Sequence, residues 1–161
     1  KLIDQLRNLE VIGWMSLIFG VLLYLSDKSK VTKKINTNFS NKSALFIGLF
    51  QILALIPGVS RSGITIMSGR MLGYNRFDST KISFFLSIPV LIAASFIGVY
   101  NIYIVGSVEL NFLAIIATIF SFIFSYITIV VFFNFIKKFS LSIFVIYRII
   151  LATIILGIVY L

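Results

Sequence analysis

The sequence contains no cysteine and no histidine, and only five of its 161 residues are acidic. Without cysteine, the chain cannot form disulfides, use a thiol as a nucleophile or bind a metal through thiolate groups. Without histidine, it lacks the side chain that most often serves as a general base or metal ligand near neutral pH. The chemistry open to these residues therefore rests on hydroxyls, lysine, arginine and a few carboxylates.

Charged residues are scarce, whereas apolar residues are abundant. Charged residues make up 12% of the chain and hydrophobic residues 60%, against roughly 45–50% apolar residues in soluble domains. Two uncharged runs, residues 82–108 and 110–136, each exceed the about 20 helical residues that cross a hydrocarbon core of roughly 30 Å. A soluble globule is excluded, and we expect a multi-pass protein embedded in the lipid bilayer.

The formal net charge of +9 does not indicate a nucleic-acid partner, because the lysines gather between apolar spans and not along a soluble face. Five lysines lie in the polar segment 27–42 against a single acid, Asp27. This bias predicts that the segment is a cytoplasmic loop and that Glu109 lies in an outer loop. The predicted membrane spans are residues 11–26, 82–99, 110–136 and 142–161.

Residues 43–56 are mostly apolar, but as a helix they would reach only about 21 Å at 1.5 Å per residue, which is too short to cross a membrane. They stop at the sequence Pro-Gly-Val-Ser-Arg-Ser-Gly, residues 57–63, after which a second short segment, 64–72, leads into a polar loop holding Arg76, Asp78 and Lys81. Two half-length helices around a break predict a re-entrant hairpin over residues 43–73. The predicted fold is all-α, with residues 1–161 as one membrane domain.

The break carries the most informative side chain, Arg61. An arginine deep in a bilayer costs about 2.5–3.5 kcal/mol on insertion scales, so it requires an anionic partner or water. Ser60, Ser62 and Thr65 supply hydroxyls, and Gly63 allows backbone to approach a ligand closely. If the second half-helix begins near Ser62, its free N–H groups and positive dipole end point to the same place, which predicts a phosphate-binding site.

A simpler interpretation of the same spacing remains open. Pro57 and Gly58 would then form a turn, Ser60 or Ser62 would cap a helix, and Arg61 would extend its side chain to an interface. The two interpretations differ for the substitution Arg61→Lys. We expect this change to be damaging only if Arg61 binds phosphate, because lysine lacks the planar fork that gives two parallel hydrogen bonds.

Residues 51–66, Gln-Ile-Leu-Ala-Leu-Ile-Pro-Gly-Val-Ser-Arg-Ser-Gly-Ile-Thr-Ile, strongly resemble the second signature of the undecaprenyl-diphosphate phosphatase family of the bacitracin-resistance type. The resemblance continues through residues 84–89, Phe-Phe-Leu-Ser-Ile-Pro, and residues 144–148, Phe-Val-Ile-Tyr-Arg. It implies a hydrolase of the bacterial plasma (inner) membrane that converts the polyprenyl diphosphate to its monophosphate. This reaction recycles the lipid carrier for cell-wall synthesis, at a pocket open to the extracytoplasmic side.

Carried over by motif, the resemblance implies that Arg61 and Ser60 are catalytic and that Ser60, Arg61, Ser62, Gly63 and Thr65 bind the substrate. Family members also have an earlier signature, with a glutamate pair and a Ser-Ser-x-Gly-His run, that resembles an inverted-repeat partner of this hairpin. That signature is not in this chain. We therefore expect a C-terminal fragment that is inactive alone, whose divalent cation (Mg or Ca) would be held by the other half; a homodimer is a further expectation.

Two alternative functions bear on these assignments. A transporter or flippase would bind an anionic lipid or solute at broken helices without cleaving it. A lipid phosphatase of the acid-phosphatase type requires histidines, which this sequence lacks.

Arg148 lies in the last predicted span, where its side chain either enters the membrane cavity or extends to the cytoplasmic face. The family resemblance at Tyr147-Arg148 favours a buried structural contact.

Overall fold

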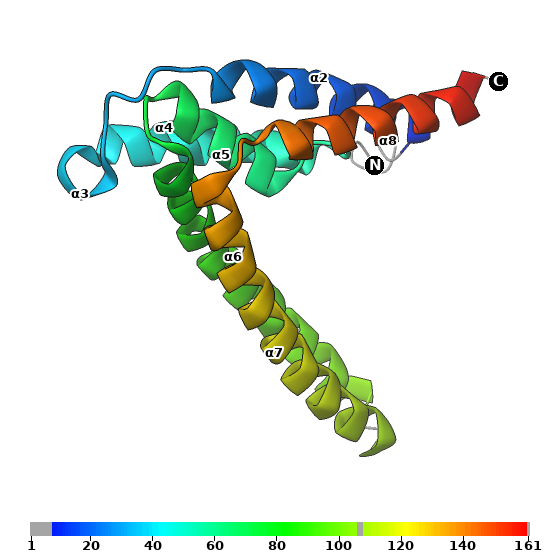
Figure 1. The fold of residues 1–161 in the computed structure, drawn as a ribbon. Coiled ribbons are helices and arrows are strands. Elements are labelled where there is room, and N and C mark those ends of the chain that lie inside the picture. The colour runs from blue at the N-terminus through cyan, green and yellow to red at the C-terminus, as the bar shows by residue number, and fades with distance from the viewer. Residues whose placement is uncertain (1–7, 106–107, 161) are drawn as a thin grey trace. The chain divides into compact units, whose positions relative to one another are not determined.

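The computed structural model describes residues 8–105 and 108–160, and no β-strand occurs within them (Figure 1). Four helices are long and apolar enough to cross a membrane: α2 (Leu9–Asp27), α6 (Arg76–Val105), α7 (Val108–Lys138) and α8 (Ser142–Tyr160). The shorter elements are α3 (Ile35–Asn38), α4 (Asn41–Ile52), the 3-10 helix η1 (Leu53–Leu55) and α5 (Arg61–Met71). The prediction of an all-α, polytopic membrane protein is therefore confirmed.

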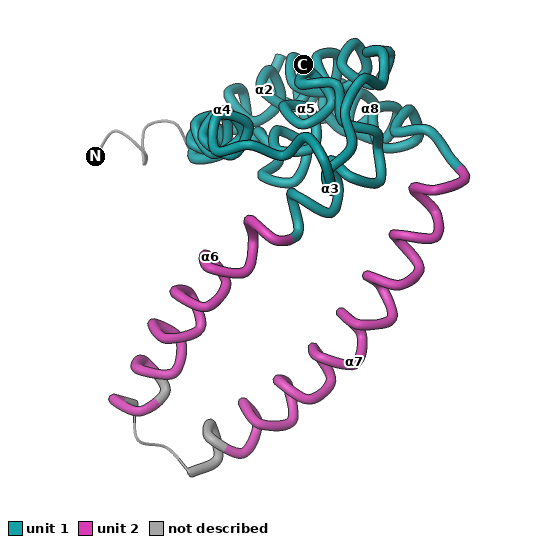
Figure 2. Tube along the Cα trace, turned by 90° about the vertical axis from the view of Figure 1, so that its left-hand side faces the viewer, with its two compact units in different colours: residues 1–84, 139–161 teal, residues 85–138 magenta. Residues whose placement is uncertain are grey.

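The helices form two compact units, coloured separately in Figure 2. Unit 1 comprises residues 1–84 and 139–161, and unit 2 comprises residues 85–138. Helix α6 begins in unit 1 and continues into unit 2. Glu109, expected in an outer loop, lies instead in the first turn of α7, because that helix begins at Val108.

The pairing of α2 with α8 is the most extensive helix contact in unit 1 (Figure 1). Small residues bring the two helices together: Gly13 and Gly20 of α2 are buried and face side chains of α8. A Cβ atom added to Gly13 would lie only 2.7 Å from the side chain of Leu156. Because apolar surface gains little from burial in lipid, such close backbone packing is the usual means of joining helices in a membrane.

The predicted hairpin is present as two short helices separated by a break. Helix α4 continues directly into η1, which ends at Leu55. Helix α5 begins at Arg61 and packs against α4. Ser40 caps α4 through a hydrogen bond from the N–H of Ser43 to its hydroxyl, with a distance of 3.3 Å. The helix–break–helix pattern within residues 43–73 is thus as predicted, while its re-entrant placement in a bilayer stays a prediction.

Residues 76–81, predicted as part of a polar loop, form the first turns of α6. The structure explains the difference by a reciprocal cap: the N–H of Asp78 donates to Oδ1 of Asn75 over 2.7 Å, and Nδ2 of Asn75 donates to Oδ2 of Asp78 over 3.0 Å. The first bond is an ordinary N-cap, and the second joins the two side chains, where a capping box would use the backbone N–H of the cap residue. Arg76, Asp78 and Lys81 are therefore helical, and Asp78 is buried.

The lysine-bearing segment 27–42 is more ordered than the predicted loop, because it is attached to the turn between α5 and α6. The N–H groups of Thr32 and Lys33 both donate to the carbonyl of Gly73, over 2.9 and 3.0 Å. Tyr74 is fully buried, and its hydroxyl donates to the carbonyl of Asn38 over 3.0 Å. The segment therefore folds around a buried aromatic ring.

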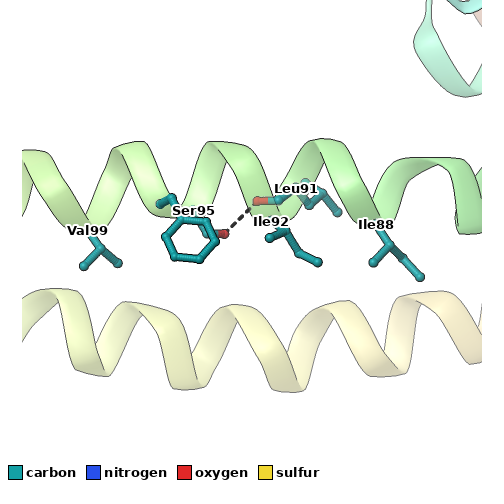
Figure 3. A pocket seen from close by; sticks show the side chains of 6 residues that line it. Ile88, Leu91, Ile92, Ser95 and Val99 are labelled. Atoms are coloured by element: carbon teal, nitrogen blue, oxygen red, sulfur yellow. Dashed lines mark hydrogen bonds between the residues drawn. The ribbon is translucent and has the colours of Figure 1, made fainter.

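Unit 2 consists of two antiparallel helices, the later part of α6 and α7 (Figure 2). Most of their described side chains are exposed. One face of α6 lines an apolar groove of about 470 Å³, and several of its side chains point toward α7 (Figure 3). The groove residues recur every three or four positions, as one helix face requires. They are Ile88, Leu91, Ile92, Ser95, Phe96 and Val99.

Candidate functional site at the helix break

The start of α5 is defined by a side-chain cap. Ser60 has extended backbone angles, φ −66° and ψ 128°, and its Oγ accepts a hydrogen bond of 3.1 Å from the N–H of Gly63. The capping role considered for Ser60 in the simpler interpretation is therefore present. Within the described part of the chain, the N–H groups of Arg61 and Ser62 have no recorded hydrogen-bond partner. Two backbone donors thus remain available at the positive end of the helix dipole.

The break rests directly on α2 at Gly58. This glycine has a φ of +92°, in the left-handed region, and a Cβ atom placed on it would lie 2.6 Å from the carbonyl oxygen of Ile12. Both facts require glycine here, because any other side chain would be strained and would collide with the backbone. The hydroxyl of Ser16 also donates to the carbonyl of Gly58, over 3.3 Å.

Arg61 is the first residue of α5, and it is half-buried. Its guanidinium has no hydrogen bond or ion pair recorded with any residue that the structure describes. Beside it, the exposed Ser62 has its hydroxyl 3.2 Å from that of Ser60. The predicted residues Ser60, Arg61, Ser62 and Gly63 therefore lie together in the first turn of α5.

Thr65 lies one turn further along, at 1% exposure. Its hydroxyl is within hydrogen-bond distance of the carbonyls of Arg61 and Ser62 and lies 2.6 Å from the hydroxyl of Ser83 in α6. The hydroxyl of Thr65 thus contacts the backbone of the first turn of α5 and the side chain of Ser83 in α6. Its assignment as a substrate ligand stays a prediction.

Arg148, outside the predicted site, reaches the break from α8. Its Nη2 donates to the carbonyl of Gly58 over 2.8 Å, and a Cβ atom added to Gly63 would lie 2.8 Å from its Nη1. The side chain is half-buried and makes a structural contact within unit 1, while its placement in the membrane, in the cavity or at the cytoplasmic face, stays a prediction. An arginine inside an apolar span is by default a sign of function, but its partner, 90 positions away, gives no sequence signal.

Known proteins are similar to this chain over nearly its whole length. A sequence profile of the family described as "Bacitracin resistance protein BacA" matches residues 1–154. The chain belongs to this family. An undecaprenyl-diphosphatase of Pelagibacter ubique is 56% identical over 154 residues, which are 96% of this chain and 60% of that protein.

Two further BacA-family relatives carry the same name. The undecaprenyl-diphosphatase of Dinoroseobacter shibae is 40% identical over 162 residues, covering 98% of this chain and 60% of the relative. That of Ruegeria pomeroyi is 38% identical over 157 residues, covering 98% of this chain and 59% of the relative. The chain therefore spans about three fifths of the length of these relatives.

The divalent cation implied by the BacA family does not fit the residues at the break. Mg²⁺ and Ca²⁺ prefer carboxylate and carbonyl oxygens, whereas the first turn of α5 offers hydroxyls, N–H donors and a guanidinium. No group of three or more acidic side chains that could hold a metal occurs in residues 8–105 and 108–160. The break is suited to an anion.

Proposed function

We propose that the complete protein hydrolyses undecaprenyl diphosphate to undecaprenyl phosphate and inorganic phosphate, with the break before α5 binding the diphosphate. In this reaction an oxygen of water forms a bond to the terminal phosphorus, and the bond from that phosphorus to the bridging oxygen breaks. The observation that carries the proposal is the guanidinium of Arg61 at the capped start of α5, which bonds to none of the residues that the structure describes. The names of the relatives favour this reaction over transport.

Each group in the first turn of α5 suits a phosphate oxygen. The guanidinium of Arg61 can give two parallel hydrogen bonds, and the free N–H groups of Arg61 and Ser62 add backbone donors at the positive helix end. The hydroxyl of Ser60 accepts from Gly63 and lies 3.2 Å from that of Ser62, so the hydrogen of whichever serine accepts in that pair can be donated to an oxygen of the substrate. These groups would stabilise the charge that builds up on the transferred phosphoryl group.

A complete reaction also requires a group that activates the attacking water. Neither histidine nor a carboxylate occurs within residues 57–63, so this task is proposed for residues outside the break. A site for the divalent cation, Mg or Ca, is likewise proposed only for a part of the complete protein outside the break.

The same proposal includes a location in the bacterial inner membrane with residues 27–42 in the cytoplasm. Lys28, Lys30, Lys34 and Lys42 are exposed, and the nearby acids Asp27 and Asp78 are buried. The exposed charge of this segment is therefore positive, as expected for a cytoplasmic loop. A homodimer is also proposed, from the family resemblance alone.

The test is phosphate release from undecaprenyl diphosphate by the complete protein reconstituted in liposomes. We expect Arg61→Ala to lower kcat/KM by about a hundredfold or more, because a charge-assisted bidentate contact to the transition state is lost. Lys30→Ala, which removes an exposed cation outside the break, is the matched control and should leave the rate unchanged. Equal rates for Arg61→Ala and the unsubstituted protein would exclude Arg61 from the mechanism.

A further inference from the structure

The carbonyl oxygen of Gly58 accepts hydrogen bonds from two different helices. Nη2 of Arg148 in α8 donates to it over 2.8 Å, and Oγ of Ser16 in α2 donates to it over 3.3 Å. A carbonyl in a helix break has no partner within its own helix, and one left unpaired away from water costs several kcal/mol in a bilayer. Of the two donors, Arg148 is charged and closer, so its bond is the stronger.

Gly58 stands two residues before the cap of α5, and the intervening chain has little freedom. Val59 is buried at 6% exposure, and its N–H donates to the carbonyl of Ile56 over 3.1 Å. Ser60 then caps the helix. A fixed carbonyl at Gly58 therefore also fixes the positions of Ser60 and Arg61 at the start of α5.

The absence of a side chain at Gly63 lets the same guanidinium lie against the first turn of α5. A Cβ atom at this position would be 2.8 Å from Nη1 of Arg148 and 3.3 Å from Oγ of Ser60. Arg148 thus lies between the end of the break and the start of the helix. Through these contacts, Arg148 joins α8 to the end of the break and to the start of α5.

We infer that Arg148 is a positioning residue, which holds the break through the carbonyl of Gly58 so that the first turn of α5 meets the phosphate in a fixed orientation. This inference rests on the proposed function for its catalytic consequence, but the contact itself can be tested without any reaction. The role needs one charged donor, whereas the role proposed for Arg61 needs the planar fork of a guanidinium. Lysine should therefore replace Arg148 but not Arg61.

The first experiment measures amide hydrogen exchange of residues 56–63 by mass spectrometry, with the protein in lipid nanodiscs. Arg148→Gln should raise exchange in this segment roughly tenfold, as expected for the loss of a charge-assisted hydrogen bond. Arg148→Lys should remain within about threefold of the unsubstituted protein. Thr153→Ala, which alters an exposed hydroxyl on the same helix, is the control and should have no effect. Unchanged exchange in Arg148→Gln would overturn the inference.

The second experiment measures kcat and KM for undecaprenyl diphosphate with the same variants of the complete protein. Arg148→Gln should lower kcat by about tenfold to a hundredfold with little change in KM, because misplacement of the site weakens transition-state binding most. Arg148→Lys should restore most of kcat. If Arg148→Lys and Arg148→Gln are equally impaired and KM rises in both, Arg148 binds the substrate directly and the positioning role is wrong.

The two experiments separate this inference from the proposed function. If the complete protein releases no phosphate from the substrate, the proposed function fails, while the exchange measurement still decides whether Arg148 holds the break. If exchange is unchanged in Arg148→Gln while phosphate is released normally, the proposed function stands and the positioning role fails.

Discussion

Asp27 and Arg76 are joined by two hydrogen bonds, of 2.7 and 2.9 Å, from Nε and Nη2 of the arginine to the two carboxylate oxygens. This bidentate pair connects the last residue of α2 to the first residue of α6. Arg70, at the end of α5, has its Nε 3.7 Å from the same carboxylate and donates to the carbonyls of Asp27 and Ser29, each over 2.7 Å. One buried acid therefore holds three helices of unit 1 together.

We predict that Asp27→Asn lowers the free energy of unfolding by about 2–3 kcal/mol. Breaking a fully buried ion pair costs about 3–5 kcal/mol, and the effect is smaller here because the side chain of Arg76 is 38% exposed. Thermal unfolding in detergent is the measurement, with the exposed Lys30→Gln as control. A melting temperature equal to that of the control would show that the pair adds nothing to stability.

The second prediction concerns the glycine in the break. Gly58→Ala should destabilise the protein by at least about 1–2 kcal/mol, the cost of a left-handed backbone at a residue with a Cβ atom, with a further cost from the contact with Ile12. Gly48→Ala is the matched control, because a Cβ atom there meets nothing within 4 Å. As a helix-interior substitution, the control should stabilise by about 0.5–1 kcal/mol. Equal melting temperatures for the two variants would contradict this prediction.

A third prediction compares two buried threonines. In the described part of the chain, Oγ1 of Thr80 has no hydrogen-bond partner, whereas Oγ1 of Thr65 has three within reach. Valine has nearly the same shape without the hydroxyl, so Thr80→Val should be neutral or stabilising by up to about 1 kcal/mol, and Thr65→Val should destabilise by about 1 kcal/mol. Thermal unfolding of the two variants distinguishes them, and the opposite order would refute the assignment.

The fourth prediction tests the orientation in the membrane. Because the sequence has no cysteine, a single introduced cysteine reports accessibility without background. Asn36→Cys should react with an impermeant maleimide only after the cells are opened, whereas Tyr160→Cys, at the other end of unit 1, should react in intact cells. Both residues are exposed. The reverse pattern would invert the proposed topology.

Much of this fold follows from local sequence patterns. Long uncharged runs predict α2, α6, α7 and α8, and the Pro-Gly break predicts two short helices with α5 beginning near Ser62, one residue from its observed start. The start of α6 was predicted too late, because polar residues 76–81 resembled a loop. The spacing of Asn75 and Asp78, which form the reciprocal cap, was the local signal for an earlier start.

The remaining features depend on contacts between distant residues. Arg70 is only 3% exposed, and its guanidinium donates to the carbonyl of Asp27, 43 positions away. Arg148 reaches Gly58 across 90 positions. Neither pairing leaves a periodic pattern in the sequence, because each depends on how α2, α5 and α8 pack. The motif residues were therefore predictable as a group, and the family resemblance favoured a structural contact for Arg148, but the partner of Arg148, Gly58, could not be predicted.

The central claim is that the guanidinium of Arg61 binds a diphosphate. The most direct measurement is the affinity of the complete protein for a nonhydrolysable polyprenyl methylene-bisphosphonate, determined by calorimetry for the unsubstituted protein, Arg61→Lys and Arg61→Ala. We predict that both variants bind at least about tenfold more weakly, since lysine cannot supply the bidentate contact. Unchanged affinity in Arg61→Ala would contradict the claim, and full affinity in Arg61→Lys would contradict the bidentate contact.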